Sequence, residues 1–176
     1  MTPTASGRLA LHEAAAGGHT DAIARLLTAA PAAAMVPTEP KRELPLHLAA
    51  RKGDVSACQQ LLSVAPAAAM TPAAGGCLPL HIASWHGHTD AIACLLQAAP
   101  AAALVHGGPC SRLPLQIAAR KGHLPACQQL LTAAPATAMT PALFGCLALH
   151  EATVGGHTAV MERLLQAAPA AAMVPT

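Results

Sequence analysis

The sequence predicts an all-α protein built from five copies of one two-helix unit, and three regularities carry this prediction. A Leu-His pair, or Leu-Gln in its place, recurs every 34 or 35 residues, at 11–12, 46–47, 80–81, 115–116 and 149–150. A glycine follows each pair, and a Leu-Leu pair follows each glycine, at 26–27, 61–62, 95–96, 130–131 and 164–165. Self-similarity at such a period indicates a repeat architecture rather than a single globular core.

The predicted units form one array, with approximate boundaries at 5–39, 40–73, 74–108, 109–142 and 143–176. A longer period is superimposed on this one. Residues 9–35 match 78–104 at 19 of 27 positions, and 44–70 match 113–139 equally well. Two neighbouring units therefore duplicated together as one block, so that each residue has a block equivalent two units away.

Each unit contains the signals for two short helices. The glycine is expected to end the first helix in the left-handed conformation. The second helix is expected to begin at the residue after the glycine, which is a histidine in four units and Asp54 in the second unit. Asp54 and the threonines at 20, 89 and 158 suit such an N-terminus. Pro125 falls in a first helical turn, where its missing N–H does no harm. The second helix should stop before Ala-Pro, because a residue that precedes proline resists the α conformation, and about 10 loop residues should follow.

Composition restricts how such a chain can fold. Alanine fills 45 of the 176 positions, whereas there is one Trp, one Phe and no Tyr. The core must therefore consist of Leu, Ile, Val, Met and Ala in thin layers. No apolar run approaches the roughly 20 residues of a membrane span. The net charge of +2 gives little reason to expect nucleic-acid binding.

The cysteines point to a reducing compartment. The six cysteines are widely spaced along the chain without a CxxC pair, which argues against zinc. No signal peptide is seen at the start, so reduced thiols and an intracellular location are expected. Cys58, Cys94 and Cys127 fall in second helices and should be core residues, whereas Cys77, Cys110 and Cys146 fall in loops.

Two segments carry a family resemblance. Residues 44–54, LPLHLAARKGD, and residues 78–88, LPLHIASWHGH, each followed by Leu-Leu, resemble ankyrin repeats. The Thr that usually opens the motif is Leu here, and the usual Gly-Ala-Asp-Val-Asn ending is replaced by Ala-Pro-Ala-Ala-Ala-Met. The resemblance implies an L-shaped solenoid of stacked antiparallel helix pairs with projecting loops. It also implies a non-catalytic module that binds a partner protein on its concave face.

The ten histidines give little support for a chemical site. Eight of them occupy the Leu-His and Gly-His positions, which in ankyrin-like units are structural and bond to backbone groups. His86-Gly87-His88 is an HxH sequence without a third ligand, so no metal site is expected. Neither His12-Glu13 nor His150-Glu151 continues into HExxH, and no phosphate loop or nucleophile motif occurs. The sequence therefore predicts no enzyme activity and no cofactor.

Positions that differ between units are the candidate binding residues. The two residues before each glycine, together with the loop tips, form the contact surface in the resemblance. Here they include the only Trp and two basic pairs, and loop-side residues add further charge: Arg51, Lys52, Trp85, His86, Arg120, Lys121, Arg112 and Glu43. Trp and Arg are the residue types most often found as interface hot spots. The alternative interpretation is that these are ordinary solvated charges with one chance exposed aromatic.

The first functional hypothesis is a protein-interaction scaffold whose partner presents carboxylates and an apolar side chain. The alternative is the targeting segment of a larger enzyme or signalling protein. Binding to an acidic polymer is a weaker third hypothesis, and the oligomeric state is not predicted. Both ends stop in mid-pattern, so a longer array or a truncated gene is expected. Glu13 and Glu151 replace Leu or Ile of inner units and are expected to soften the terminal units slightly.

Overall fold

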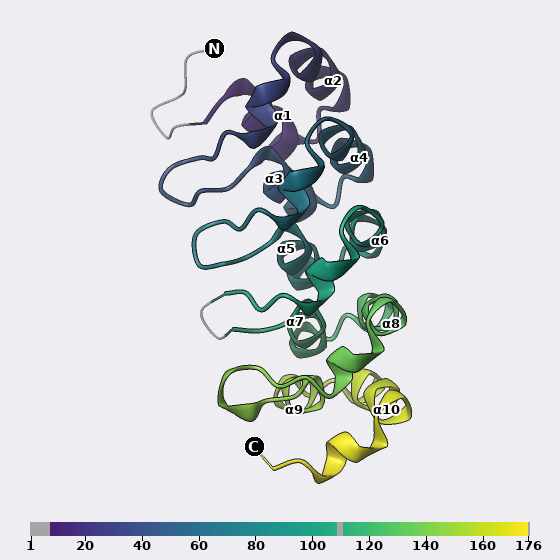
Figure 1. The fold of residues 1–176 in the computed structure, drawn as a ribbon. Coiled ribbons are helices and arrows are strands. Elements are labelled where there is room, and N and C mark those ends of the chain that lie inside the picture. Colours follow the sequence, from purple (N-terminus) through teal and green to yellow (C-terminus); the bar gives the residue numbers. More distant parts are fainter. Residues whose placement is uncertain (1–7, 109–110, 176) are drawn as a thin grey trace.

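The computed structural model describes residues 8–108 and 111–175, and within them the protein is all-α, as predicted. Ten α-helices form five consecutive pairs, and no strand is present in these residues (Figure 1). The first helices of the pairs are α1 (Ala10–Gly17), α3 (Pro45–Lys52), α5 (Pro79–His86), α7 (Pro114–Lys121) and α9 (Ala148–Gly155). The second helices are α2 (Thr20–Ala29), α4 (Val55–Val64), α6 (Thr89–Ala98), α8 (Leu124–Ala133) and α10 (Thr158–Ala167).

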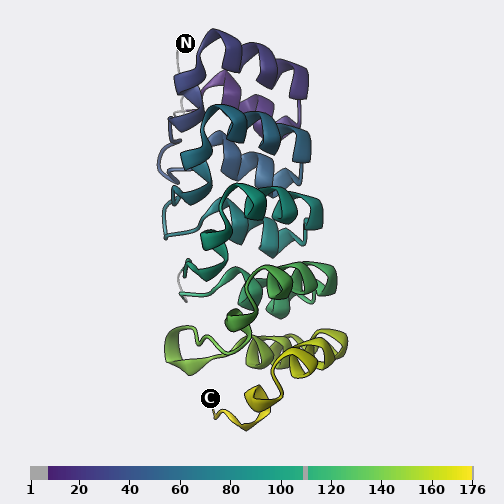
Figure 2. The ribbon, with the colours of Figure 1, turned by 45° about the vertical axis from the view of Figure 1, so that its right-hand side comes forward.

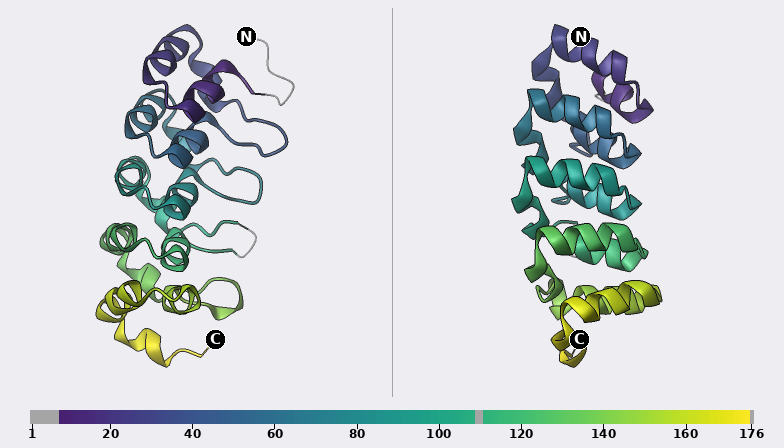
Figure 3. Two further views of the ribbon diagram at one scale, coloured as in Figure 1. Left: turned by 180° about the vertical axis from the view of Figure 1, so that it is seen from behind. Right: turned by 90° about the vertical axis from the view of Figure 1, so that its right-hand side faces the viewer.

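The pairs stack in two parallel columns. Each first helix packs on the next first helix and each second helix on the next second helix, while the two helices of a pair pack on each other. The result is an elongated array with the long loops projecting beyond the first-helix column (Figures 2 and 3). Of the predicted units, residues 5–7, 109–110 and 176 lie outside the described part of the chain.

The ends of the first helices follow from their sequence. Proline is the first helical residue of α3, α5 and α7, where its fixed φ suits the helix and its missing N–H costs no bond. At the other end, Gly53 and Gly87 cap α3 and α5 with φ values of 77° and 73°. This left-handed conformation is strained for any residue with a Cβ, so the glycine ends the helix as predicted.

Each second helix ends at the residue before Ala-Pro, as predicted, but the segment that follows is not simply a loop. The proline starts a turn of 3₁₀-helix in every unit, at Pro31–Met35, Pro66–Met70, Pro100–Leu104, Pro135–Ala138 and Pro169–Met173. Alanines of such a turn, for example Ala68 and Ala69, are buried against the helices. Small side chains at these positions let the tight turn lie flat on the stack.

Four methionines at the ends of the 3₁₀ turns do not have the core role that the sequence predicts for methionine. Met35, Met70 and Met139 are about two-fifths exposed, and Met173 is 86% exposed, so these residues are not core. The core instead combines buried leucines with buried alanines of the first helices, such as Ala49 and Ala50. Alanine at the contact lets neighbouring helices approach closely, which explains how the array packs without aromatic side chains.

Among the second helices, α4 has a side-chain N-cap. The Oδ1 atom of Asp54 accepts a hydrogen bond from the Ala57 N–H at 2.9 Å. In the other units a histidine stands at this position and makes no cap bond. Asp54 therefore performs the capping role that the sequence predicts for it.

Replacing Asp54 with alanine should lower the free energy of unfolding by about 1 kcal/mol, the usual cost of losing an N-cap. Asp54→Asn should retain most of this stability, because the amide oxygen can accept the same bond. Urea denaturation of the three proteins measures the difference. Equal stability of the alanine variant and the wild type would show that the cap contributes nothing.

No helix in the described part of the chain is long and apolar enough to cross a membrane.

Candidate interaction surface

Histidines of the Leu-His position tie each unit to the loop that follows it. The Nδ1 atom of His47 accepts a hydrogen bond from the Leu44 N–H at 3.0 Å, and its Nε2 donates to the Cys77 carbonyl at 3.2 Å. His81 makes the equivalent bonds to Leu78 and Val105. Both rings are buried, and burial, which outweighs the carbonyl hydrogen bonds, lowers the pKa of each to about 4. The structural role predicted for this position is confirmed.

Gln116 stands at this position in the fourth unit and reproduces both bonds. Its Oε1 accepts from the Leu113 N–H at 2.8 Å, and its Nε2 donates to the carbonyls of Thr140 and Cys146. Glutamine therefore supplies the same acceptor and donor as a neutral histidine, without a group that titrates near neutral pH.

The Gly-His histidines fix the backbone of the predicted binding residues. His88, His123 and His157 donate from Nε2 to carbonyls of the preceding unit at 3.0 to 3.1 Å. The acceptors are the carbonyls of Arg51, Trp85 and Arg120, respectively. A Cβ on the capping glycine of the preceding unit would approach each ring to within 2.6 Å. The glycine is thus required for this contact as well as for its positive φ.

Trp85 lies near the C-terminal end of α5 and is 48% exposed. The Lys121 Nζ atom lies over its ring, 3.7 Å from the centroid, which is a cation–π contact. Beside the ring is a cavity of about 280 Å³ that spans α3, α5 and α7. Its lining consists of Arg51, Cys77, His81, Ile82, Trp85, His86 and Ile117. We call this cavity the Trp85 pocket.

Arg51, on the rim of the Trp85 pocket, is paired within the protein. Its guanidinium makes two hydrogen bonds to the Glu43 carboxylate. Burial by itself raises the pKa of Glu43, but the bonds and charge of Arg51 outweigh it and hold that pKa below its ordinary value. Arg51 remains 39% exposed at its side chain, so it offers the solvent a charge that Glu43 already partly neutralises.

The arginines of the fourth unit have a different partner from Arg51 of the second unit. Residue 112 is the block equivalent of Glu43, yet it is an arginine. Arg112 Nε and Arg120 Nη1 both donate to Glu151 of the next unit, at 2.6 and 2.9 Å. Glu151 is 5% exposed at its side chain, so the expectation that it softens the terminal unit is wrong. It is a buried partner of two arginines.

Glu13 behaves differently from Glu151. It is exposed and pairs with Arg8 at 3.2 Å, as a polar residue at the surface of the first unit would.

His86, which lines the Trp85 pocket, stacks on His88. Their ring centroids are 5.7 Å apart and their planes differ by 17°. Partial burial, together with the charges of neighbouring basic groups, lowers the pKa of His86. The two rings form a stack, and among the described residues no group of three His, Cys, Asp or Glu side chains that could hold a metal ion is found.

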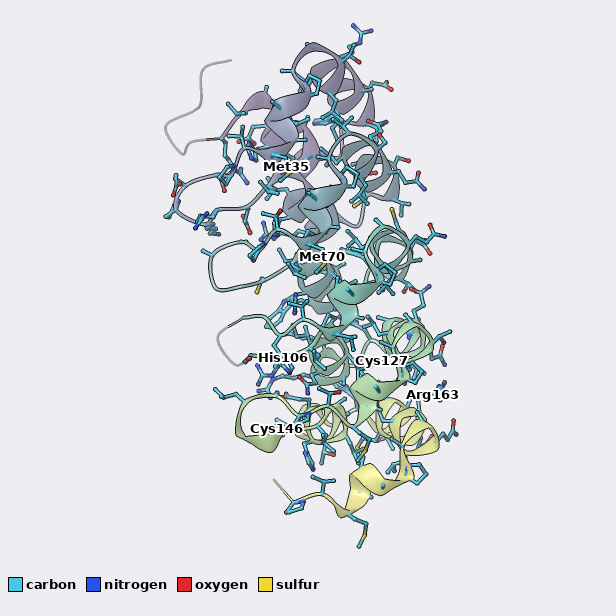
Figure 4. The ribbon with its side chains drawn as sticks, viewed as in Figure 1. Met35, Met70, His106, Cys127, Cys146 and Arg163 are labelled. Atoms are coloured by element: carbon cyan, nitrogen blue, oxygen red, sulfur yellow. The ribbon has the colours of Figure 1, made fainter. Side chains whose placement is uncertain are left out.

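The cysteines divide as predicted. Cys58, Cys94 and Cys127 are buried in second helices, whereas Cys77 and Cys146 lie in the loop segments. Figure 4 labels one cysteine of each kind, Cys127 on α8 and Cys146 in the loop before α9. Burial raises the pKa of Cys58 and Cys127 to about 12, so these thiols are poor nucleophiles. Cys110 lies outside the described residues.

The structure brings only some of the predicted binding residues together. Arg51, Trp85 and His86 share the Trp85 pocket, and Lys121 covers its aromatic ring. Lys52 lines a neighbouring cavity of about 280 Å³ with Arg8, Ala16, Leu48 and Arg51. Arg112 and Arg120 form a separate cluster on Glu151, one unit further along.

Three residues of these two clusters were not among the predicted binding residues. Ile82 and Ile117 line the Trp85 pocket, and Glu151 binds Arg112 and Arg120. A signal for Glu151 was present: residues 112 and 151 depart together from their block equivalents, Glu43 and Ile82.

The geometry defines a helical-repeat protein with a fixed scaffold and one surface that varies between units. A family model described as ankyrin repeats matches residues 11–106 with three copies, which is more than half of the chain. The chain belongs to the ankyrin-repeat family. Comparison with curated proteins gave no match. The helix pairs α7–α8 and α9–α10, beyond the matched segment, repeat the same architecture. Ankyrin repeats are in general protein–protein interaction modules.

Proposed function

We propose that the protein is a non-catalytic interaction module that binds a partner protein at the Trp85 pocket. The observation that carries the proposal is the half-exposed Trp85 beside an apolar cavity with a basic rim. An aromatic side chain next to a pocket is typical of an interface hot spot. The block equivalents of Trp85 are Ala16 in the first unit and Val154 in the fifth, so neither of these units offers a second tryptophan.

The chemistry of the surface indicates the partner. The pocket has room for an apolar side chain of the partner. Such a side chain would contact Ile82 and Ile117, because both line the pocket. Lys52, Lys121 and the exposed part of Arg51 would attract a neighbouring carboxylate. Because Glu43 and Glu151 already neutralise part of the arginine charge, the two lysines should dominate attraction at long range. Association should therefore slow as salt concentration rises.

The same surface would serve a recognition segment of a larger enzyme or signalling protein. In that case the partner bound at Trp85 would be the substrate or the target of the fused domain. A nucleic-acid partner is disfavoured by the low net charge of +2.

Selection of peptides from a random display library on this protein tests the proposal. We expect acidic peptides with an apolar residue, and we expect Trp85→Ala to weaken their binding at least tenfold, as for a hot spot. Val154→Ala is the matched control, since it removes an exposed apolar side chain at the equivalent position. Trp85 is the only tryptophan, so its fluorescence reports peptide binding to the wild type and to Val154→Ala, and titration calorimetry measures binding to Trp85→Ala, which lacks this reporter.

Lys52→Met and Lys121→Met test the charge without breaking an ion pair to a buried glutamate. Lys52→Met tests the charge alone, because Lys121→Met also removes the cation–π contact with Trp85. Arginine substitutions at 51 or 120 would confound the result, because each would disrupt a pair with a buried glutamate. Selected peptides that bind wild type and Trp85→Ala equally would exclude the Trp85 pocket as the binding site.

A further inference from the structure

The basic rim of the Trp85 pocket contains titratable groups whose role the proposed function does not use. His86 is exposed, lines the pocket, and stacks on His88. The Nε2 atoms of His88 and His123 donate to backbone carbonyls and so hold the scaffold together. His86 instead presents its ring to the pocket and to the neighbouring imidazole.

The charged groups that act on His86 come from every neighbouring helix. Arg51 approaches from α3, Lys121 from α7, His88 from the start of α6 and His123 from the start of α8. All four are cations or become cations on protonation. Within the described part of the chain, no carboxylate is among the groups that shift the pKa of His86. The carboxylate of Glu43 is paired with Arg51.

We propose that His86 is a specificity-determining residue that takes up a proton when a carboxylate-bearing partner segment binds, so that affinity rises as pH falls. The proposal rests on the proposed function, because it concerns the same pocket. A carboxylate seated on the rim would supply the negative charge that the cluster lacks and would favour the charged imidazole. The lysines attract the same carboxylate, but they remain charged throughout this pH range and add no pH dependence.

The direction of the effect follows from the two states. In the free protein, partial burial and neighbouring cations lower the pKa of His86 below 6.5, so the ring is neutral near pH 7. In the complex the carboxylate raises that pKa, so the bound state holds more proton. Affinity must then increase on acidification between the two pKa values, by at most about tenfold per pH unit for one proton.

The experiment measures the dissociation constant of an acidic peptide, selected from the display library, at pH 7.5 and pH 6.0. Trp85 fluorescence reports binding to the full chain. We expect binding about three- to fivefold tighter at the lower pH, and we expect less than twofold change for the same peptide with glutamine in place of each acidic residue. His86→Gln should also flatten the pH dependence of the acidic peptide. His106→Gln, which changes an exposed histidine of a loop, should leave it intact.

The outcomes separate the two claims. If no selected peptide depends on Trp85, the proposed function fails. If the acidic peptide binds through Trp85 with equal affinity at both pH values, or if His86→Gln retains the full pH dependence, the role of His86 is overturned while the proposed function stands. Circular dichroism of each variant at both pH values establishes that folding is unchanged, and the shift of the His86 ring protons in NMR gives its titration in the presence and absence of peptide.

Discussion

Acidification from pH 7 to pH 4 is expected to remove about 6 kcal/mol of folding stability through His47 and His81 together. Burial lowers the pKa of each from 6.5 to about 4. One pKa unit corresponds to about 1.4 kcal/mol, so each histidine contributes roughly 3 kcal/mol. A loss of this size is comparable with the total stability of many domains.

The pH window follows from the sign of the shift. Below pH 6.5 the unfolded chain binds protons at these histidines, whereas the folded protein does not until about pH 4. Stability is therefore full above pH 6.5 and falls progressively down to pH 4. The structural reason is that Nδ1 of each ring accepts a backbone N–H, so protonation would place two donors face to face.

The fourth unit, with Gln116 in the Leu-His position, indicates which substitution tests this pH dependence of stability. His47→Gln with His81→Gln copies the arrangement of Gln116, and should keep the fold at pH 7 while removing most of the loss on acidification. Gln116→His is the reciprocal control and should steepen the loss. Urea denaturation at several pH values measures both. A double variant that loses stability between pH 6.5 and pH 4 as steeply as wild type would refute the mechanism.

Replacing Glu151 with glutamine is expected to lower the free energy of unfolding by about 2 to 3 kcal/mol. Glu151 is a buried carboxylate that bonds two arginines of the preceding unit. Removal of one partner from a buried ion pair costs about 3 to 5 kcal/mol, and the partial exposure of Arg120 and Arg112 reduces this. The loss should be concentrated in α9 and α10, where hydrogen exchange should accelerate.

A charge exchange within the block should rescue the loss. Arg112→Glu combined with Glu151→Ile recreates the arrangement of the second and third units, in which Glu43 pairs with Arg51 beside Ile82. We expect the double variant to be more stable than either single variant, because the new carboxylate at position 112 would then pair with Arg120. If Glu151→Gln is as stable as wild type, to within about 0.5 kcal/mol, the cluster is only a surface interaction.

The helix boundaries were predictable because each has a local cause. A residue before proline resists the α conformation, and a glycine can adopt positive φ without strain, so both signals act locally. The buried role of the Leu-His histidines was also predictable, since the family resemblance implied it. The 3₁₀ turns were not predicted, because Pro-Ala-Ala-Ala has no strong preference of its own and is shaped by burial of its alanines.

The candidate site was predicted only as a set of positions. Trp85 and His86 line one pocket, but the sequence indicated only basic residues beside them and no partners for the arginines. The structure instead pairs Arg51 with Glu43, and Arg112 and Arg120 with Glu151. Residues 120 and 151 are far apart in the sequence, so no local pattern could reveal their contact.

The sequence by itself determined the architecture of this ankyrin-repeat protein. Its period fixes the number of helix pairs, and its alanines and glycines allow them to stack without aromatic side chains. The tertiary structure alone decided which charges remain available on the surface and which apolar side chains surround Trp85. Helix formation depends on residues close in sequence, whereas the pairing of charges and the shape of a pocket depend on side chains that meet only when successive units stack.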